Sequence, residues 1–247
     1  MGILKTITDE YFGETVREED EIDLTGLDVE IVSFIDNNKK YHGRGYKPKD
    51  EDLKELLKRM IEKRGYEGDF NDIDTSYIED MSLLFYREER FNGNISGWNV
   101  SKVEDMNFMF KGATSFNQPI GKWDVSSVEN MSFMFSGATS FNQPIGKWDV
   151  SKVTDMKFMF RDAKSFNQPI GNWNVSKVTN MYNMFNNAKS FNQPIGNWDV
   201  SNVEFMERMF SSTTSFNQNL SKWDLTEKDT FEIFFDCPIK DEYKPKM

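Results

Sequence analysis

Apolar residues recur along this chain with a period of 25 residues. Each unit begins with a phenylalanine followed by asparagine, and a tryptophan stands seven residues after the phenylalanine. The unit reads F-N-Q-P-I-G-K-W-D-V-S-x-V-x-[DN]-M-x-x-M-F-x-x-A-x-S and runs without a gap from Phe91 to Leu225. A degenerate unit starts at Tyr66, and a degenerate half-unit follows Leu225. One unit is too short to bury its own apolar residues, so the period predicts a solenoid, in which stacked units bury them against each other.

Spacings inside the unit predict its local structure. From Val128 to Ala138 the apolar residues are three and four positions apart, which places them on one face of a short helix. Ser126 with Glu129 fits a capping box, in which each side chain satisfies a free amide at the helix start. The W-[DN]-V stretch before Ser126 suits one brief strand. We therefore expect an α/β repeat solenoid, right-handed and leucine-rich-repeat-like, with short parallel strands and short helices.

Two columns of identical residues are expected to hold the units together. Tryptophan is the largest apolar residue of the unit and is expected in the core, although a surface column of tryptophans could instead stack on sugars. The asparagine after each phenylalanine is expected to bond the backbone of the next coil. The tryptophans are Trp98, Trp123, Trp148, Trp173, Trp198 and Trp223, and the asparagines are Asn92, Asn117, Asn142, Asn167, Asn192 and Asn217.

The segments outside the regular units divide the chain further. A strand over 29–35, a turn at Asn37-Asn38 and a return strand over 39–46 predict a small hairpin. Residues 50–64 carry leucines, methionine and isoleucine on one helical face, and Gly65 stops this helix, which is expected to cap the solenoid. The expected domains are a small N-terminal segment (1–47), a capping helix (48–65), the solenoid (66–225), and a C-terminal cap with a polar tail (226–247).

The unit W-[DN]-V-S-x-V-x-[DN]-M-x-x-M-F-x-x-A-x-x-F-N resembles the repeat of BspA-like leucine-rich-repeat proteins, a family common among bacterial surface proteins and lipoproteins. The stretch from Pro48 to Gly65 and the N-D-I-D-T-S segment at 71–76 are similar to the usual lead-in of that family. The resemblance covers about residues 47–238. It implies a leucine-rich-repeat fold, a role in adhesion or protein binding, and no catalytic residues.

Charge and hydropathy narrow the possible partners and locations. The 247 residues carry a formal net charge of −11, and an acidic surface repels phosphate backbones, so nucleic acid is not an expected partner. The chain has no long apolar run, so membrane insertion is not expected. Residues 1–16 do not fit a signal peptide. The chain as it stands is therefore expected in the cytoplasm, although the family it resembles is often secreted or at the bacterial surface. The sequence pattern does not predict whether the protein is a monomer or an oligomer.

The residue types argue against an enzyme. A single histidine, His42, and a single cysteine, Cys237, leave no histidine triad, disulfide or cysteine-based zinc cage. No cofactor and no metal are expected. One column of carboxylates could hold calcium if the units stack about 5 Å apart, although turn bonding also explains acidic residues at this position. The column consists of Asp124, Asp149, Asp199 and Asp224.

A second column predicts an interaction surface. On a helix that starts at Val103, Phe108 points away from the apolar face. Leucine or phenylalanine recurs at this position in four units, until Asn183 and Arg208 replace it. An exposed aromatic column usually marks an interaction site, whereas in an irregular segment these rings would turn inward. We expect a non-enzymatic protein-binding scaffold or adhesin-type module, with a carbohydrate-binding module or a spacer without a ligand as alternatives. The candidate stripe is Leu83, Phe108, Phe133 and Phe158.

Overall fold

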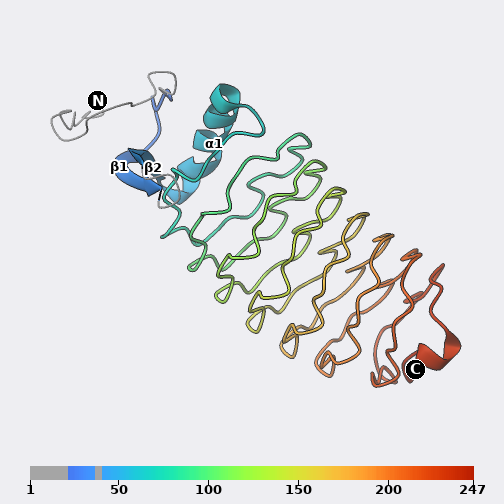
Figure 1. Cartoon of the computed structure of the whole chain (residues 1–247). Helices are drawn as coiled ribbons and strands as arrows, with labels where there is room; N and C mark the ends of the chain where they lie inside the picture. The colour runs from blue at the N-terminus through green and yellow to red at the C-terminus, as the bar shows by residue number, and fades with distance from the viewer. Residues whose placement is uncertain (1–21, 37–40) are drawn as a thin grey trace.

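A two-stranded sheet opens the part of the chain that the structure describes. The computed structural model of the protein describes residues 22–36 and 41–247 (Figure 1). Strand β1 (Val29–Asp36) pairs antiparallel with strand β2 (Tyr41–Pro48). The turn predicted at Asn37-Asn38 lies outside the described residues.

Helix α1 (Asp50–Arg64) follows β2 and spans the range that the apolar pattern predicts. It ends at Gly65, whose φ of 78° lies in the left-handed region that glycine adopts without strain. No helix in the described part of the chain is long and apolar enough to cross a membrane.

Beyond α1 the chain winds into coils that lie one behind another along a single axis (Figure 1). The described stretch from 65 to 240 contains turns and isolated bridges, but no α-helix and no extended strand. A short 3₁₀ helix, η2 (Asp241–Tyr243), lies near the C-terminus. The bridges are parallel, and six of them join one repeat position from coil to coil, which is held in turn by Asp80, Asp105, Asn130, Asp155, Asn180, Phe205 and Asp229.

Consecutive β-turns form the side of each coil that carries the bridges. Along residues 131–137, alternate amides donate to carbonyls of the next coil, at 2.7–3.1 Å. Between them, the amides of Met134 and Ser136 donate to the carbonyl three residues earlier in their own coil, and the amide of Ser132 donates to Oδ1 of Asn130. Phe133 (φ 59°) and Gly137 (φ 74°) stand at the third position of such turns. A positive φ at this position is typical of type II turns. Every coil therefore donates one row of hydrogen bonds to the next. We call this side the turn face.

The short helix predicted from Val128 to Ala138 is wrong, because turns occupy that range. Spacings of three and four also suit consecutive turns, which point the same apolar side chains inward. In a stack the turns are favoured because their alternate amides reach the neighbouring coil, whereas a helix uses its amides within one coil. The capping box is not formed either, since the amide of Ser126 donates to Oδ1 of Asp124 at 3.1 Å.

The brief strand predicted at W-[DN]-V is absent from the described structure as well. The amide of Trp123 closes a turn onto the carbonyl of Ile120 at 3.1 Å, and six of the bridges fall on the [DN]-M position, while Asp224 of the last unit bridges to Lys246. The right-handed, leucine-rich-repeat character of the fold stays a prediction.

Aromatic rings fill the interior of the stack in continuous columns. Phe135 and Phe141 of one coil lie 4.0 Å apart with their rings 10° from parallel. Phe135 also lies 5.7 Å from Phe160 of the next coil, and Trp148 lies 6.3 Å from Phe135. All four residues are at most 4% exposed. Each coil thus buries its large side chains against those of its neighbours, as a repeat stack requires.

Different segments close the two ends of the stack. At the N-terminal end, β2 joins the first coil, since Tyr46 donates to the carbonyl of Asp72 and accepts from the amide of Asp74 (2.8 and 2.7 Å). Helix α1 then takes the place of the turns and buries its apolar face. At the C-terminal end, the amide of Leu225 donates to the carbonyl of Lys246 at 2.8 Å. The buried residues of α1 are Leu53, Leu56, Leu57 and Met60.

Candidate interaction surface

The six asparagines form a ladder along the stack. Oδ1 of Asn142 accepts the amide N–H of Asn167 at 3.0 Å, and the Asn142 N–H donates to Oδ1 of Asn117 at 2.9 Å. At the C-terminal end, Asn217 accepts from the amide of Lys240 at 3.1 Å. Each side chain therefore ties one coil to the next. The members are Asn92, Asn117, Asn142, Asn167, Asn192 and Asn217.

Glutamines next to these asparagines reinforce the ladder, and sequence reasoning missed them. Nε2 of Gln168 donates to both the carbonyl oxygen and Oδ1 of Asn142, each at 3.0 Å. The signal was present, because glutamine follows the asparagine in five consecutive units. The ladder side chains are thus engaged inside the molecule, and a partner-binding site has to be sought elsewhere.

The tryptophan column lies in the interior. Nε1 of Trp148 donates to the carbonyl of Ile120 at 3.2 Å, which satisfies the indole N–H inside the core. A ring in this position offers no face on which a sugar could stack. The six tryptophans, Trp98, Trp123, Trp148, Trp173, Trp198 and Trp223, are at most 4% exposed.

The aspartate column caps turns. Asp149 Oδ1 accepts the amide of Ser151 at 3.0 Å, and hydrogen bonds from Ser151 hold the pKa of Asp149 below its ordinary value. Bonds from Thr226 lower the pKa of Asp224 to about 2. Within the described residues, no group of three or more histidine, cysteine or acidic side chains is placed to hold a metal ion. This column therefore has a structural explanation in the turns themselves.

The predicted stripe lies on the turn face. The rings of Phe108 and Phe133 are 4.3 Å apart and 8° from parallel, and those of Phe133 and Phe158 are 4.4 Å apart and 17° from parallel. Leu83 is 41% exposed. The three phenylalanines are half-buried rather than fully exposed, because each ring covers the face of its neighbour. The column thus presents ring edges to solvent.

The backbone beneath the stripe is left-handed. Phe108, Phe133 and Phe158 have φ of 58°, 59° and 58°. Bulky residues seldom adopt this conformation, which costs about 1–2 kcal/mol, and asparagine tolerates it far better. Asn183 occupies the same repeat position with φ of 55° and is 5% exposed. The fold therefore needs the left-handed turn at this position, but it does not need a phenylalanine ring.

Aromatic side chains continue on the turn face beyond the predicted column. Tyr86 meets the edge of Phe108 at 6.1 Å, and Tyr182 meets Phe158 at 5.0 Å. Further along, Phe205, Phe231 and Phe235 are 45%, 61% and 60% exposed. Sequence reasoning missed Phe205 because it followed a single repeat position. It assigned Phe231 and Phe235 to the C-terminal cap that closes the stack, which is wrong for these two side chains because they are exposed.

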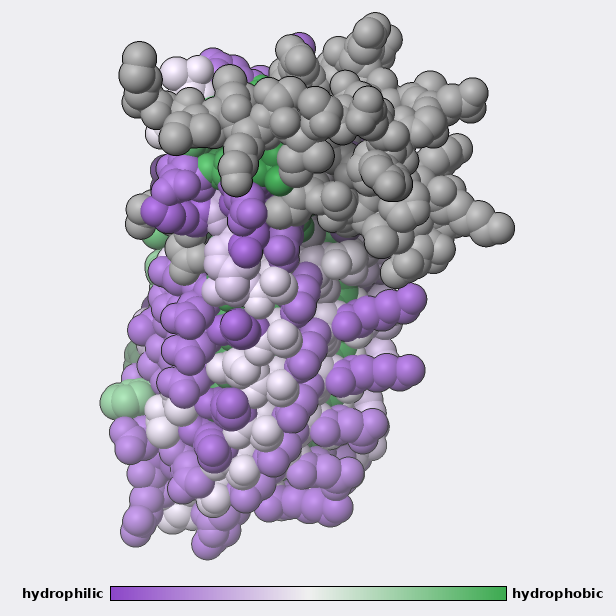
Figure 2. All heavy atoms as spheres, turned by 90° about the vertical axis from the view of Figure 1, so that its left-hand side faces the viewer, coloured by the Kyte–Doolittle hydropathy of each residue, from purple (hydrophilic) through white to green (hydrophobic). Residues whose placement is uncertain are grey.

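Exposed apolar residues are otherwise few. Figure 2 looks onto one side of the molecule, where hydrophilic side chains predominate and repeat along the stack. Among the described residues, four of the six exposed large apolar side chains belong to the turn face, namely Leu83, Phe205, Phe231 and Phe235. This side of the coils therefore differs from an evenly polar repeat surface.

Cationic side chains lie over the stripe. Lys111 Nζ is 4.7 Å from the centre of the Phe108 ring and 4.8 Å from that of Phe133. Arg87 lies 5.1 Å from the Tyr86 ring, and Arg161 lies 5.5 Å from that of Phe158. The N-terminal half of the turn face thus combines rings with positive charge in a chain whose net charge is −11.

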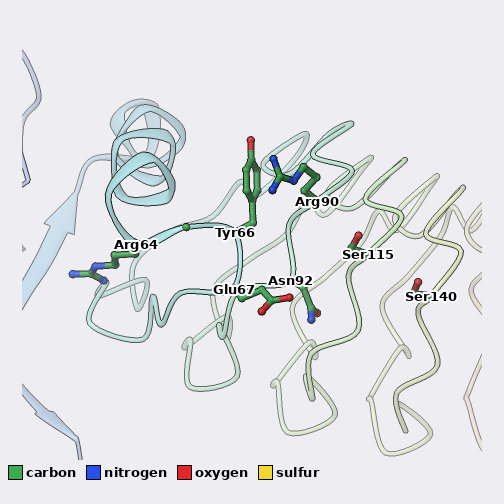
Figure 3. A pocket seen from close by; sticks show the side chains of 8 residues that line it. Arg64, Tyr66, Glu67, Arg90, Asn92, Ser115 and Ser140 are labelled. Carbon is green, nitrogen blue, oxygen red and sulfur yellow. The ribbon is translucent and has the colours of Figure 1, made fainter.

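A hollow of about 650 Å³ lies where α1 meets the stack (Figure 3). Arg90 covers the Tyr66 ring at 4.7 Å, and Arg64 turns away to Asp72 at 2.7 Å. Asn92 already accepts the amide of Asn117 in the ladder. Arg64, Arg90 and Asn92 are thus engaged with the protein itself, so the turn face is the better candidate for a partner.

A sequence family described as "Mycoplasma protein of unknown function, DUF285" matches residues 52–156 and again residues 142–241. The chain belongs to this family. The two DUF285 matches cover the coils and most of α1, and they leave β1 and β2 outside. Their overlap over 142–156 is what a repeated unit produces when two copies of one pattern fit in different registers. No curated protein and no solved structure matches the chain.

Proposed function

We propose that this DUF285 protein is a non-enzymatic scaffold that binds another protein through the turn face, with Leu83, Phe108, Phe133 and Phe158 at the centre of the contact. One observation carries the proposal. Phenylalanine occupies a left-handed turn position in three coils, where Asn183 serves the same turn with less strain. Residues held in such conformations cluster at binding sites, and an aromatic column is the usual anchor of an interface.

The stacking of the rings favours a protein partner over a glycan. A sugar or a base binds an aromatic side chain through the ring face. In the stripe, the faces of Phe133 are taken by Phe108 on one side and Phe158 on the other. Ring edges and the shallow spaces between them suit aliphatic and aromatic side chains of another polypeptide.

The family resemblance supports the same class of function. We propose that the repeat is of the BspA-like leucine-rich-repeat type and that adhesion or surface display is the context of binding. The motif W-[DN]-V-S-x-V-x-[DN]-M-x-x-M-F supports this assignment. The proposal includes no catalysis, because the sequence offers one histidine and one cysteine and no motif of an enzyme.

Affinity capture with a matched control tests the proposal. Immobilised protein is compared with the variant Phe108→Asn/Phe133→Asn/Phe158→Asn, which copies the residue of a later coil at the same position. The control is Lys122→Asn/Lys147→Asn, since asparagine occupies that position in the next two units. Quantitative mass spectrometry of proteins from the source cell should find partners held by the wild type and the control but lost by the triple variant.

The same variants separate the alternatives. Binding on a glycan array that survives the triple change would support a carbohydrate-binding module instead. Equal protein profiles for the wild type and the triple variant, together with an empty glycan array, would contradict the proposal and favour a spacer.

A further inference from the structure

The charges beside the stripe point to the chemistry of its partner. We infer that the N-terminal part of the turn face binds an acidic polypeptide segment, in which a carboxylate lies beside Arg87 and Lys111 while an adjacent apolar side chain contacts the rings. The inference rests on the proposed function and adds the class of ligand to it.

Two cations meet at one ring. The Tyr86 ring has Arg87 at 5.1 Å and Lys111 at 5.8 Å, so both positive charges lie at the N-terminal end of the stripe. Lys111 also contacts the next two rings, Phe108 and Phe133, at 4.7 and 4.8 Å. Since Phe108 and Phe133 stack on each other 4.3 Å apart, an ammonium nearly equidistant from both ring centres lies beside the apolar column, next to the ring edges.

Neither cation has an acidic partner in the part of the chain that the structure describes. Other cations of the turn face do, because Lys157 pairs with Asp155 at 3.0 Å and Arg208 pairs with Glu232 at 2.8 Å. No carboxylate of the described residues lies within 4.0 Å of Arg87 or Lys111. Their charge is therefore available to a carboxylate that comes from outside.

The acids of the bridge column bind the turns and, in the described structure, do not pair with either cation. Asp80 and Asp105 belong to the bridge column of the same coils, and each is bound to the turn. Asp80 Oδ1 accepts the amide of Ser82, and Asp105 Oδ1 accepts that of Asn107, both at 2.7 Å. Along the chain, these hydrogen-bonded carboxylates precede Leu83 and Phe108, whereas the unpaired cations follow them.

This arrangement sets the orientation and charge of a ligand. An apolar side chain loses water against the ring edges, and a neighbouring carboxylate gains a charge-assisted contact with a cation whose surroundings are partly apolar. A basic segment would be repelled by Arg87 and Lys111. A neutral apolar segment would bind the rings but leave both cations without a partner.

Peptide selection tests the inference. Wild-type protein selects from a phage-displayed library of random peptides, and the enriched pools are sequenced. We expect Asp or Glu next to Leu, Phe or Trp in the enriched peptides. The variant Arg87→Glu/Lys111→Glu should lose this preference and shift towards Lys and Arg. The control Lys164→Glu/Lys189→Glu changes the net charge equally at exposed positions outside the stripe and should keep the acidic preference.

The affinity of one selected peptide for the wild type and for a variant measures how much Lys111 contributes to binding. By fluorescence polarisation, Lys111→Gln should weaken binding about three- to ten-fold, as expected for the loss of one partly screened charge pair, and added salt should weaken the wild type more than the variant.

Two outcomes overturn the inference. If the wild type selects apolar peptides without acidic residues, and the Phe-to-Asn triple variant loses them, the charge assignment is wrong while the proposed scaffold function stands. If the charge-reversed variant still selects acidic peptides, Arg87 and Lys111 do not bind the carboxylate of the ligand. A wild type that enriches no sequence contradicts both the inference and the proposed function.

Discussion

Phe133 and Asn183 occupy the same repeat position two coils apart, and the backbone treats them alike. Their φ angles are 59° and 55°, and each amide donates to a carbonyl of the next coil, at 2.9 and 3.0 Å. Their side chains differ, because Asn183 is 5% exposed while Phe133 is half-buried in a column of rings. The turn requires a left-handed residue at this position, and asparagine meets that requirement. The turn therefore does not explain why the earlier coils carry phenylalanine.

The coils with phenylalanine at this position, here called the phenylalanine half, and the later coils from Asn183 on, here called the asparagine half, should share one core. The loss of a core tryptophan from either half should have the largest effect on stability. Trp148 lies in the phenylalanine half and Trp198 in the asparagine half, each 4% exposed and each bonded through Nε1 at 3.2 Å. Trp148→Ala and Trp198→Ala should each cost about 3–5 kcal/mol, measured by chemical denaturation. A loss confined to one of the two variants would show that the halves are not equivalent inside.

The asparagine ladder gives the next largest effect. Asn142→Ala removes the acceptor of the Asn167 amide and of the Gln168 side chain, and it should cost about 1–3 kcal/mol. Asn192→Ala in the other half should cost the same, since Asn192 accepts from Asn217 and Gln218 in the same way. An unchanged unfolding free energy in both variants would remove the ladder from the list of stabilising features.

The exchange of residues at the compared position should have a smaller effect. Asn183→Phe introduces the left-handed strain of about 1–2 kcal/mol, which stacking on Phe158 offsets by about 0.5–1.5 kcal/mol. The unfolding free energy should therefore change by no more than about 1.5 kcal/mol. A loss of several kcal/mol would mean that the later coils cannot accept a ring, and that Asn183 is required for more than its backbone.

The smallest effect concerns Glu207, in the asparagine half. Burial first, and then the charge of Asp229, raise the pKa of Glu207 above its ordinary 4.5. A raised carboxyl pKa means that the folded state holds the proton more tightly, so stability is lost as the pH rises from 4.5 through the folded pKa. Glu207→Gln should raise the melting temperature near neutral pH and leave it unchanged well below pH 4.5. If the variant and the wild type melted at the same temperature near neutral pH as well as at low pH, the raised pKa of Glu207 would be contradicted.

The features that repeat at a fixed spacing, and the amphipathic helix before them, could be predicted from the sequence. The ladder at Asn142, the interior position of Trp148 and the range of α1 follow from the period and from the amphipathic face of residues 50–64. The helix expected from Val128 to Ala138 was wrong because turns and helices bury the same positions. The choice between them depends on hydrogen bonds between coils, which side-chain spacing does not encode.

The candidate surface was only partly predictable. The column of Phe108, Phe133 and Phe158 came from one repeat position. The cations over it and the later ring at Phe231 lie at other positions, and only the turn geometry brings them to the same side. Glycine at 112 and 137, and asparagine at 183, are residues that favour left-handed turns, and they were the available signal that this segment is not helical.

The unfolding free energy of Phe108→Asn/Phe133→Asn/Phe158→Asn shows whether the fold needs the turns and not the rings. The variant loses two ring stacks and two edge contacts, about 0.5–1.5 kcal/mol each, and relieves part of the left-handed strain of about 1–2 kcal/mol at each of the three positions. We expect a cooperative transition with a stability close to that of the wild type, because the losses and the gains are of similar size. A loss of several kcal/mol, or an unfolded protein, would contradict this expectation and assign the column to the core.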